Sequence, residues 1–175
     1  MHKTLVLTLS GRDRPGLLEQ VAVVVSGHGG SFADSRMVAV GGRIAGLQLV
    51  NLPEHGVPAL LAGLRELAAS LSDFAVDVAD GAERVAPGAR LTLELIGHDR
   101  PGIVREVTEV LARHGVSIEE LETRCVPGSF AGGEMFEARA RLHLPPGLPG
   151  ERLRSLLAAL AQEMMVDITL EDSHP

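Results

Sequence analysis

The sequence has few aromatic side chains and little positive charge. It contains four Phe, no Tyr and no Trp among 175 residues, so stacking platforms for single-stranded nucleic acid are almost absent. Its 16 Lys and Arg stand against 23 Asp and Glu, which gives a formal net charge of −7. The acidic excess is present in both halves of the chain, so the basic footprint that contacts a phosphate backbone is missing. We therefore expect no direct binding to nucleic acid.

Cysteine and long apolar runs are also scarce. The single cysteine, Cys125, excludes an internal disulfide, which fits a reducing compartment. It has no histidine or acidic partner in the sequence pattern, so we expect a buried or idle thiol rather than a nucleophile. The longest Val/Ala block, at 21–25, is far shorter than a bilayer span, and the N-terminal apolar run is too short for a signal peptide. These absences predict a cytoplasmic protein without a membrane segment.

What the sequence does contain is a repeat. The stretch GRDRPG at 11–16 returns as GHDRPG at 97–102, and the surrounding residues 5–31 match 91–117 at 13 of 27 positions without a gap. Shared turn residues with shared periodicity predict two copies of one domain.

The two copies are expected to be joined by a short linker. Residues 81–88 are polar and end in Pro-Gly, which is typical of a linker. We therefore predict a first domain at 1–80 and a second at 89–175.

Each copy shows the same series of periodicities. An alternating strand precedes the turn, an apolar helical stripe follows it, then two strands, a second amphipathic helix and a last strand. The alternating leucines are Leu5, Leu7 and Leu9, then Leu91, Leu93 and Leu95. The first-helix stripes are Leu17, Leu18, Val21, Val24 and Val25, then Ile103, Val104, Val107, Val110 and Leu111. The middle strands are predicted at 31–40 and 43–51, then at 116–126 and 134–143.

Punctuating residues support these boundaries. Pro15 and Pro101 suit the first helical turn, while Gly29 and Gly115 are expected to be left-handed helix caps. Gly41-Gly42 predicts a two-residue hairpin, and PGSFAGG at 127–133 a looser one. The order β-α-β-β-α-β, found twice, predicts an α+β protein of two ferredoxin-like domains, each with both helices on one face of a four-stranded antiparallel sheet.

The repeated turn has two interpretations. A helix N-terminus offers free N–H groups that favour a carboxylate or phosphate, and Gly16 and Gly102 would let a ligand approach the backbone. Alternatively, Asp13 and Asp99 simply cap the helices. Gly11 is expected, with its counterpart Gly97, to let the chain leave the strand in a conformation that other residues resist.

The polar residues near the turn leave similar alternatives. Arg14 and Arg100 could pair with a ligand carboxylate or form surface ion pairs. Ser31 and Ser117, which open the second strands, could reach a ligand or cap a turn.

Catalytic and metal chemistry find little support. His28 and His114 suit helix C-termini, and no metal-ligand spacing stands out. The sequence offers no nucleophile–base pair and no carboxylate pair that is present in both copies of the repeat. We therefore expect no enzyme, no cofactor and no metal.

The combination of an RPG turn, an apolar helix ending in HG and a polar residue opening the next strand resembles the ACT domain, in tandem over essentially the whole chain. The stretches 13–36 and 121–127 resemble the glycine cleavage system transcriptional repressor family, which consists of two ACT domains and little else. The resemblance implies a regulatory amino-acid sensor that controls glycine-cleavage genes through a partner protein. It also implies side-by-side pairing of two domains through their second strands into one eight-stranded sheet, within the chain or across a homodimer.

The resemblance further implies a ligand site where two domains meet. A small amino acid, glycine or serine-like, would contact the turn and the residue that opens the second strand, where the family often has Asn and this chain has Ser. The candidate ligand-binding residues are Gly11, Arg12, Asp13, Arg14, Pro15, Gly16, Leu17, Ser31, Gly97, His98, Asp99, Arg100, Pro101, Gly102, Ile103 and Ser117. The replacement of Arg12 by His98 predicts two unequal sites. The alternative function is a protein-interaction module that needs no ligand.

Overall fold

The computed structural model describes residues 1–81, 87–128 and 133–172. Within it the chain divides into two compact units, Met1–Arg84 and Val85–Pro175, each with a hydrophobic core of its own. We call these units the first and the second domain.

The predicted linker falls largely outside the described residues. Of 81–88, the part at 82–86 is not described. The predicted domain bounds, 1–80 and 89–175, therefore stay predictions.

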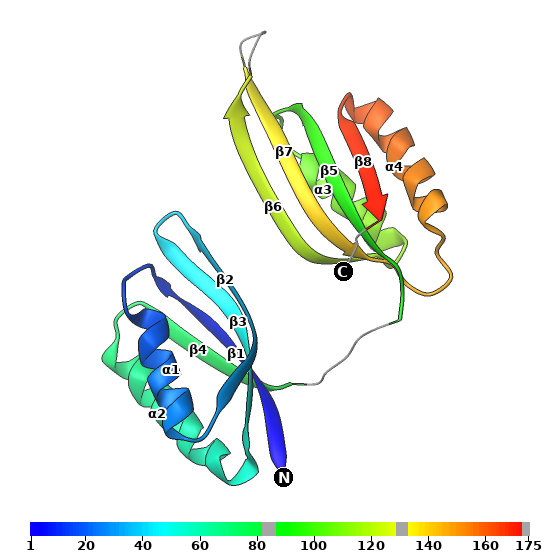
Figure 1. Ribbon diagram of the computed structural model, residues 1–175. Coiled ribbons are helices and arrows are strands. Elements are labelled where there is room, and N and C mark those ends of the chain that lie inside the picture. Colours follow the sequence, from blue (N-terminus) through cyan, green and yellow to red (C-terminus); the bar gives the residue numbers. More distant parts are fainter. Residues whose placement is uncertain (82–86, 129–132, 173–175) are drawn as a thin grey trace. The chain divides into compact units, whose positions relative to one another are not determined.

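Both domains have the predicted order of elements (Figure 1). The first contains β1 (His2–Arg12), α1 (Leu17–Gly27), β2 (Ser31–Val40), β3 (Arg43–Pro53), the short 3₁₀ helix η1 (Glu54–Gly56), α2 (Val57–Ser70) and β4 (Phe74–Asp80). The second contains β5 (Arg90–His98), α3 (Ile103–Arg113), β6 (Ser117–Pro127), β7 (Glu134–His143), α4 (Gly150–Met164) and β8 (Asp167–Asp172). The duplicated α+β fold is confirmed.

Each domain contains one four-stranded antiparallel sheet. The strand orders are β2-β3-β1-β4 and β6-β7-β5-β8, so the strand that leads into the repeated turn is central in both. Figure 1 shows α1 and α2 on the same face of the first sheet, and α3 and α4 are packed together likewise. β2 and β6 are edge strands in these orders. The expected pairing of two sheets into one of eight strands stays a prediction.

The alternating leucines form the sheet side of each core. Leu5, Leu7 and Leu9 are at most 2% exposed, as are their counterparts in β5, because every second side chain of a strand points to the helix-covered face. Fewer residues of the first helices are buried in each core than the predicted apolar stripes contain. In both first helices the second stripe residue lies outward, with Leu18 44% and Val104 40% exposed.

Glycines fix the hairpin and the helix ends as predicted. Gly41 and Gly42 have φ values of 58° and 76°, the left-handed pair that joins strands of right-handed twist. After α1, the Gly29 N–H donates to the Ser26 carbonyl and the Gly30 N–H to the Val25 carbonyl, which is a Schellman motif. Gly115 ends α3 in the same way. Of the looser hairpin predicted at 127–133, the part at 129–132 lies outside the described residues.

Candidate functional site at the strand–helix turns

Two backbone hydrogen bonds hold the turn after β1 in place. The Arg12 N–H donates to the Asp73 carbonyl at 3.2 Å, and the Asp13 N–H donates to the Gly42 carbonyl at 3.0 Å. The first bond joins the turn to the α2–β4 connection, and the second joins it to the tip of the β2–β3 hairpin. The turn is therefore a fixed part of the domain, supported on both sides.

The first glycine of each turn is required by close packing. Gly11 and Gly97 lie within β1 and β5 and are not among the glycines with positive φ, so the expectation of a special backbone conformation is wrong. A Cβ at Gly97 would lie 2.4 Å from Val166 Cγ1, and one at Gly11 would lie 2.9 Å from the Asp73 carbonyl oxygen. Neighbouring chain segments occupy the space of a side chain at both positions.

The second glycine of each turn starts the helix. Gly16 and Gly102 are the N-caps, with φ of 85° and 99°. A left-handed residue cannot continue an α-helix toward the N-terminus, so α1 and α3 begin directly after these glycines. Pro15 and Pro101 therefore precede the helices, and their expected position in the first helical turn is wrong.

The aspartates do not cap the helices. The N-caps are glycines, and neither aspartate accepts a side-chain hydrogen bond from a helical N–H among the described residues, so the capping alternative is wrong. Asp99 instead influences Cys125. Desolvation, the negative charges of Asp99 and Glu134 and hydrogen bonding to Asp99 raise the pKa of the Cys125 thiol. Cys125 is exposed, not buried, and its raised pKa disfavours the nucleophilic thiolate.

Free backbone donors remain where α1 begins. The first helical bond of the ladder runs from the Gln20 N–H to the Gly16 carbonyl at 3.1 Å. The N–H groups of Leu18 and Glu19 have no acceptor among the described residues. Together with the helix dipole, such donors favour a negatively charged group.

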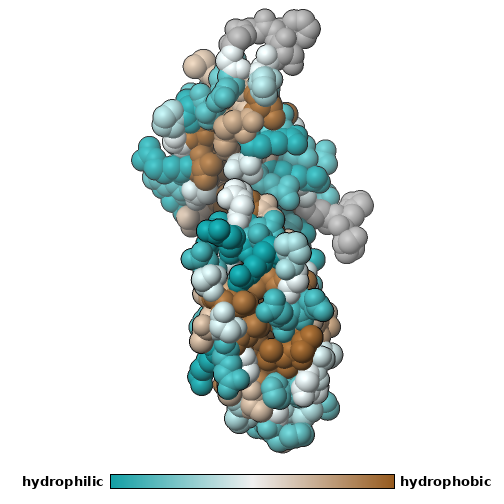
Figure 2. Space-filling model, turned by 90° about the vertical axis from the view of Figure 1, so that its left-hand side faces the viewer, coloured by the Kyte–Doolittle hydropathy of each residue, from teal (hydrophilic) through white to brown (hydrophobic). Residues whose placement is uncertain are grey.

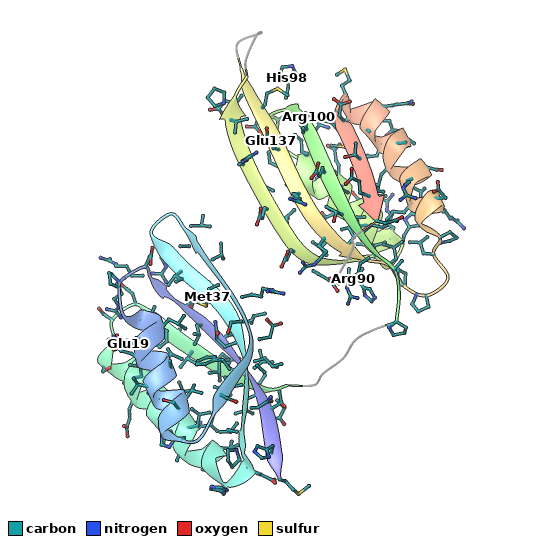
Figure 3. The ribbon with its side chains drawn as sticks, viewed as in Figure 1. Glu19, Met37, Arg90, His98, Arg100 and Glu137 are labelled. Atoms are coloured by element: carbon teal, nitrogen blue, oxygen red, sulfur yellow. The ribbon has the colours of Figure 1, made fainter. Side chains whose placement is uncertain are left out.

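The arginine of the second turn is paired within its own domain. Arg100, labelled in Figure 3, donates from Nη1 and Nη2 to the two carboxylate oxygens of Glu106, both at 3.0 Å. This hydrogen bond and the opposite charges raise the pKa of Arg100 and lower that of Glu106, although desolvation acts against both shifts. The arrangement is a bidentate Arg–carboxylate pair.

The arginine of the first turn has no such partner. Arg14 is half-buried, and its Nε and Nη2 atoms are shielded from solvent without a hydrogen-bond acceptor in the described part of the chain. Position 20, which corresponds to Glu106, holds Gln20, whose amide donates to the Gly16 carbonyl at 3.4 Å. Two identical DRPG turns therefore present their arginines in different states.

The position at which the two turn sequences differ lies at the surface. Arg12 makes an exposed ion pair with Asp73, with Nη2 3.6 Å from the carboxylate, and His98 is also exposed. Exposed pairs of this kind contribute little to stability.

The two predicted serines lie far from the turn of their own domain. Ser31 is paired through β3 with Thr4 near the start of β1, whereas the turn follows Arg12 at its end. Along β1, Thr4 and Arg12 are eight residues apart, which is roughly 26 Å at about 3.3 Å per residue. Ser117 has the same relation to its turn. A small ligand that contacts both groups would need a second domain, so this shared contact stays a prediction.

Three further features of the described residues bear on the expectations from the sequence. They contain no group of three or more His, Cys, Asp or Glu side chains placed to bind a metal ion. His114 at the end of α3 interacts through Nδ1 with the Val110 carbonyl at 2.9 Å. No helix in the described ranges has the length and apolar character to cross a membrane.

Two family profiles, both of the ACT domain, match the chain at residues 3–78 and 91–145. The chain belongs to the ACT domain family. It is a tandem ACT protein, as the repeated turn and the helix ends predicted.

Two solved structures resemble the tandem ACT chain over its whole length. An unknown protein from Galdieria sulphuraria is 29% identical, with 99% of this chain and 100% of that chain covered and a TM-score of 0.87. A protein described as a glycine cleavage system transcriptional repressor is 18% identical, with 100% and 99% covered and a TM-score of 0.72. The second likeness concerns the fold alone. No curated protein matches the chain in sequence.

Sequence reasoning missed the residue pair that distinguishes the two turns. Gln20 and Glu106 occupy equivalent positions of the repeat, six residues after the turn arginine. The ungapped alignment of the two copies shows this difference, because it places Gln20 opposite Glu106. Its meaning depends on the fold, because the arginine precedes the helix and the carboxylate lies in its first turn.

Proposed function

We propose that this tandem ACT protein is a regulator without catalytic activity that binds a small amino acid, glycine or serine, at a strand–helix turn. The observation that supports this most lies at Arg14, beside the start of α1, where Nε and Nη2 are shielded from solvent and have no acceptor among the described residues. A carboxylate placed there would satisfy the guanidinium nitrogens and could accept from free helical N–H groups.

The space above the turn supports the same proposal. Among the described residues, a Cβ built at Gly16 meets only the Glu19 carboxylate, at 3.7 Å, so the backbone of this glycine is open to a small molecule. In an α-amino acid the carboxylate and the ammonium lie a few bonds apart. Arg14 and Glu19 offer one charge of each sign to such a zwitterion.

The downstream action that we propose is control of glycine-cleavage gene expression through a protein partner. It is supported by the sequence resemblance to that repressor family and by the shared tandem fold. The net charge of −7 disfavours direct contact with DNA, so a partner would have to make that contact. We propose the cytoplasm as the location.

A second candidate function, docking of a protein without any ligand, is favoured by one observation. The edge strand β2 of the first sheet exposes Val38 (58%) and Val40 (70%), and the neighbouring strand β3 exposes Leu47 (52%). Figure 2 shows hydrophobic side chains at the surface of the protein. Apolar groups gathered at a sheet edge are typical of interaction sites.

Calorimetric titration against the twenty amino acids tests the proposed function. We expect heat of binding and a raised melting temperature with glycine or serine. The Gly16→Ala variant should bind more weakly, because its methyl group stands where the ligand approaches and its φ of 85° is strained for alanine.

Gly29→Ala is the matched control. It has a φ of 75° at the opposite end of α1, so it carries a similar backbone strain of about 1–2 kcal/mol but should bind as the wild type does. If no amino acid gives heat or a thermal shift at millimolar concentration, the sensor proposal is wrong and ligand-free docking is favoured.

A further inference from the structure

The two turns differ in whether their arginine already has a carboxylate. In the second domain the Arg100 guanidinium already donates to both carboxylate oxygens of Glu106. In the first domain the Arg14 nitrogens Nε and Nη2 are shielded and unpartnered within the described residues. Guanidinium nitrogens that are shielded without an acceptor have lost their hydration without replacement, which is an unfavourable state.

The cause is one substitution between the repeats. Glu106 supplies the carboxylate in α3, whereas the equivalent Gln20 is neutral and its amide turns back to the Gly16 carbonyl. A glutamine offers one acceptor oxygen and no charge, so it cannot neutralise an arginine as a carboxylate does.

A second difference concerns the charge next to each turn. Glu19, labelled in Figure 3, places its carboxylate over Gly16, and no ion pair links it to Arg14 among the described residues. The equivalent residue of the second domain is Arg105. Among the described residues, the first turn thus offers an arginine without a carboxylate partner and, in Glu19, a negative charge. The second turn offers an arginine already paired with Glu106 and, in Arg105, a further positive charge.

We infer that the first turn is the ligand-accepting turn, and that Glu106 occupies the second as a built-in substitute for the ligand carboxylate. The ligand class is a small molecule with a free carboxylate, which binds Arg14; an α-ammonium group would face Glu19. The identity of that ligand as an amino acid rests on the proposed function, whereas the difference between the two turns does not.

Exchanging the two residues tests the inference directly. Wild type, Gln20→Glu, Glu106→Gln and the double variant are titrated with sodium acetate and with glycine. Binding is followed through the side-chain Nε–H resonances of Arg14 and Arg100 in ¹⁵N-labelled protein.

In the wild type we expect the Arg14 resonance to move with either probe while that of Arg100 stays in place. Gln20→Glu should weaken the response of Arg14 by about tenfold or more, because an internal carboxylate then competes for the fork. Glu106→Gln should make Arg100 respond as well. The double variant should respond at Arg100 alone.

The gain at Arg100 keeps the test independent of lost folding, because a disordered variant gains no specific site. The inference is overturned if Gln20→Glu responds like the wild type, if Arg100 moves in the wild type, or if neither probe moves Arg14. Acetate binding at Arg14 without binding of any amino acid would instead refute the proposed function and leave the inference standing. Amino-acid binding without a shift of the Arg14 resonance would refute the inference and leave the proposed function standing.

Discussion

Replacing Leu7 with alanine is expected to lower the free energy of unfolding of the first domain by about 2–5 kcal/mol. Leu7 is 0% exposed and lies in the middle of β1, between Gln48 of β3 and Val78 of β4. Removing its side chain leaves a cavity that a sheet fixed on both sides cannot close.

The repeat supplies the matched variant for this experiment. Leu93 is the equivalent residue of β5 and is 2% exposed in the core of the second domain. Because each domain has its own core, Leu7→Ala should remove amide-exchange protection from the first domain only, and Leu93→Ala from the second only. Equal loss of protection in both domains would show that they unfold as one unit.

The second large effect is expected at Gly97. A methyl group there would lie 2.4 Å from Val166 Cγ1 and 3.0 Å from its Cβ, so Gly97→Ala should destabilise the second domain by about 1–3 kcal/mol through overpacking. Thermal unfolding followed by circular dichroism measures the change.

Two companion variants test the cause of this effect. Adding Val166→Ala removes the nearer methyl group and should recover part of the loss. At Gly11 the obstacle is the Asp73 backbone carbonyl, which no side-chain replacement removes, so Gly11→Ala has no such rescue. An unchanged melting temperature for Gly97→Ala would contradict the packing role of this glycine.

The fold could be predicted from the sequence because its signals are local. Leu5, Leu7 and Leu9 report a buried strand face by their spacing, and Gly41-Gly42 and Gly29 mark positions where the backbone must be left-handed. Each of these residues is explained by its nearest neighbours along the chain. The repeat then presents the same signals twice.

The roles that sequence reasoning misassigned depend on distant segments. Gly11 is a glycine because the chain at Asp73 passes over it, and no pattern near residue 11 contains that information. Gln48 is 1% exposed in the first core, where Ser35 donates a hydrogen bond to its side-chain oxygen, and the sequence analysis did not single out either residue.

The candidate site shows the same division. The repeat identifies the turn residues. Whether Arg14 has a carboxylate partner depends on position 20, which holds Gln20 where the second copy has Glu106. The predicted inequality of the two turns was placed at Arg12 and His98, which lie at the surface. The structure adds a second difference, in the pairing of Arg14 and Arg100.

A crystal structure of the protein soaked with glycine tests the central claim most directly. We predict that the glycine carboxylate lies against Nε and Nη2 of Arg14, with the Arg100–Glu106 pair intact and no ligand at the second turn. Glycine bound at Arg100, or an empty first turn in well-ordered crystals, would contradict the account.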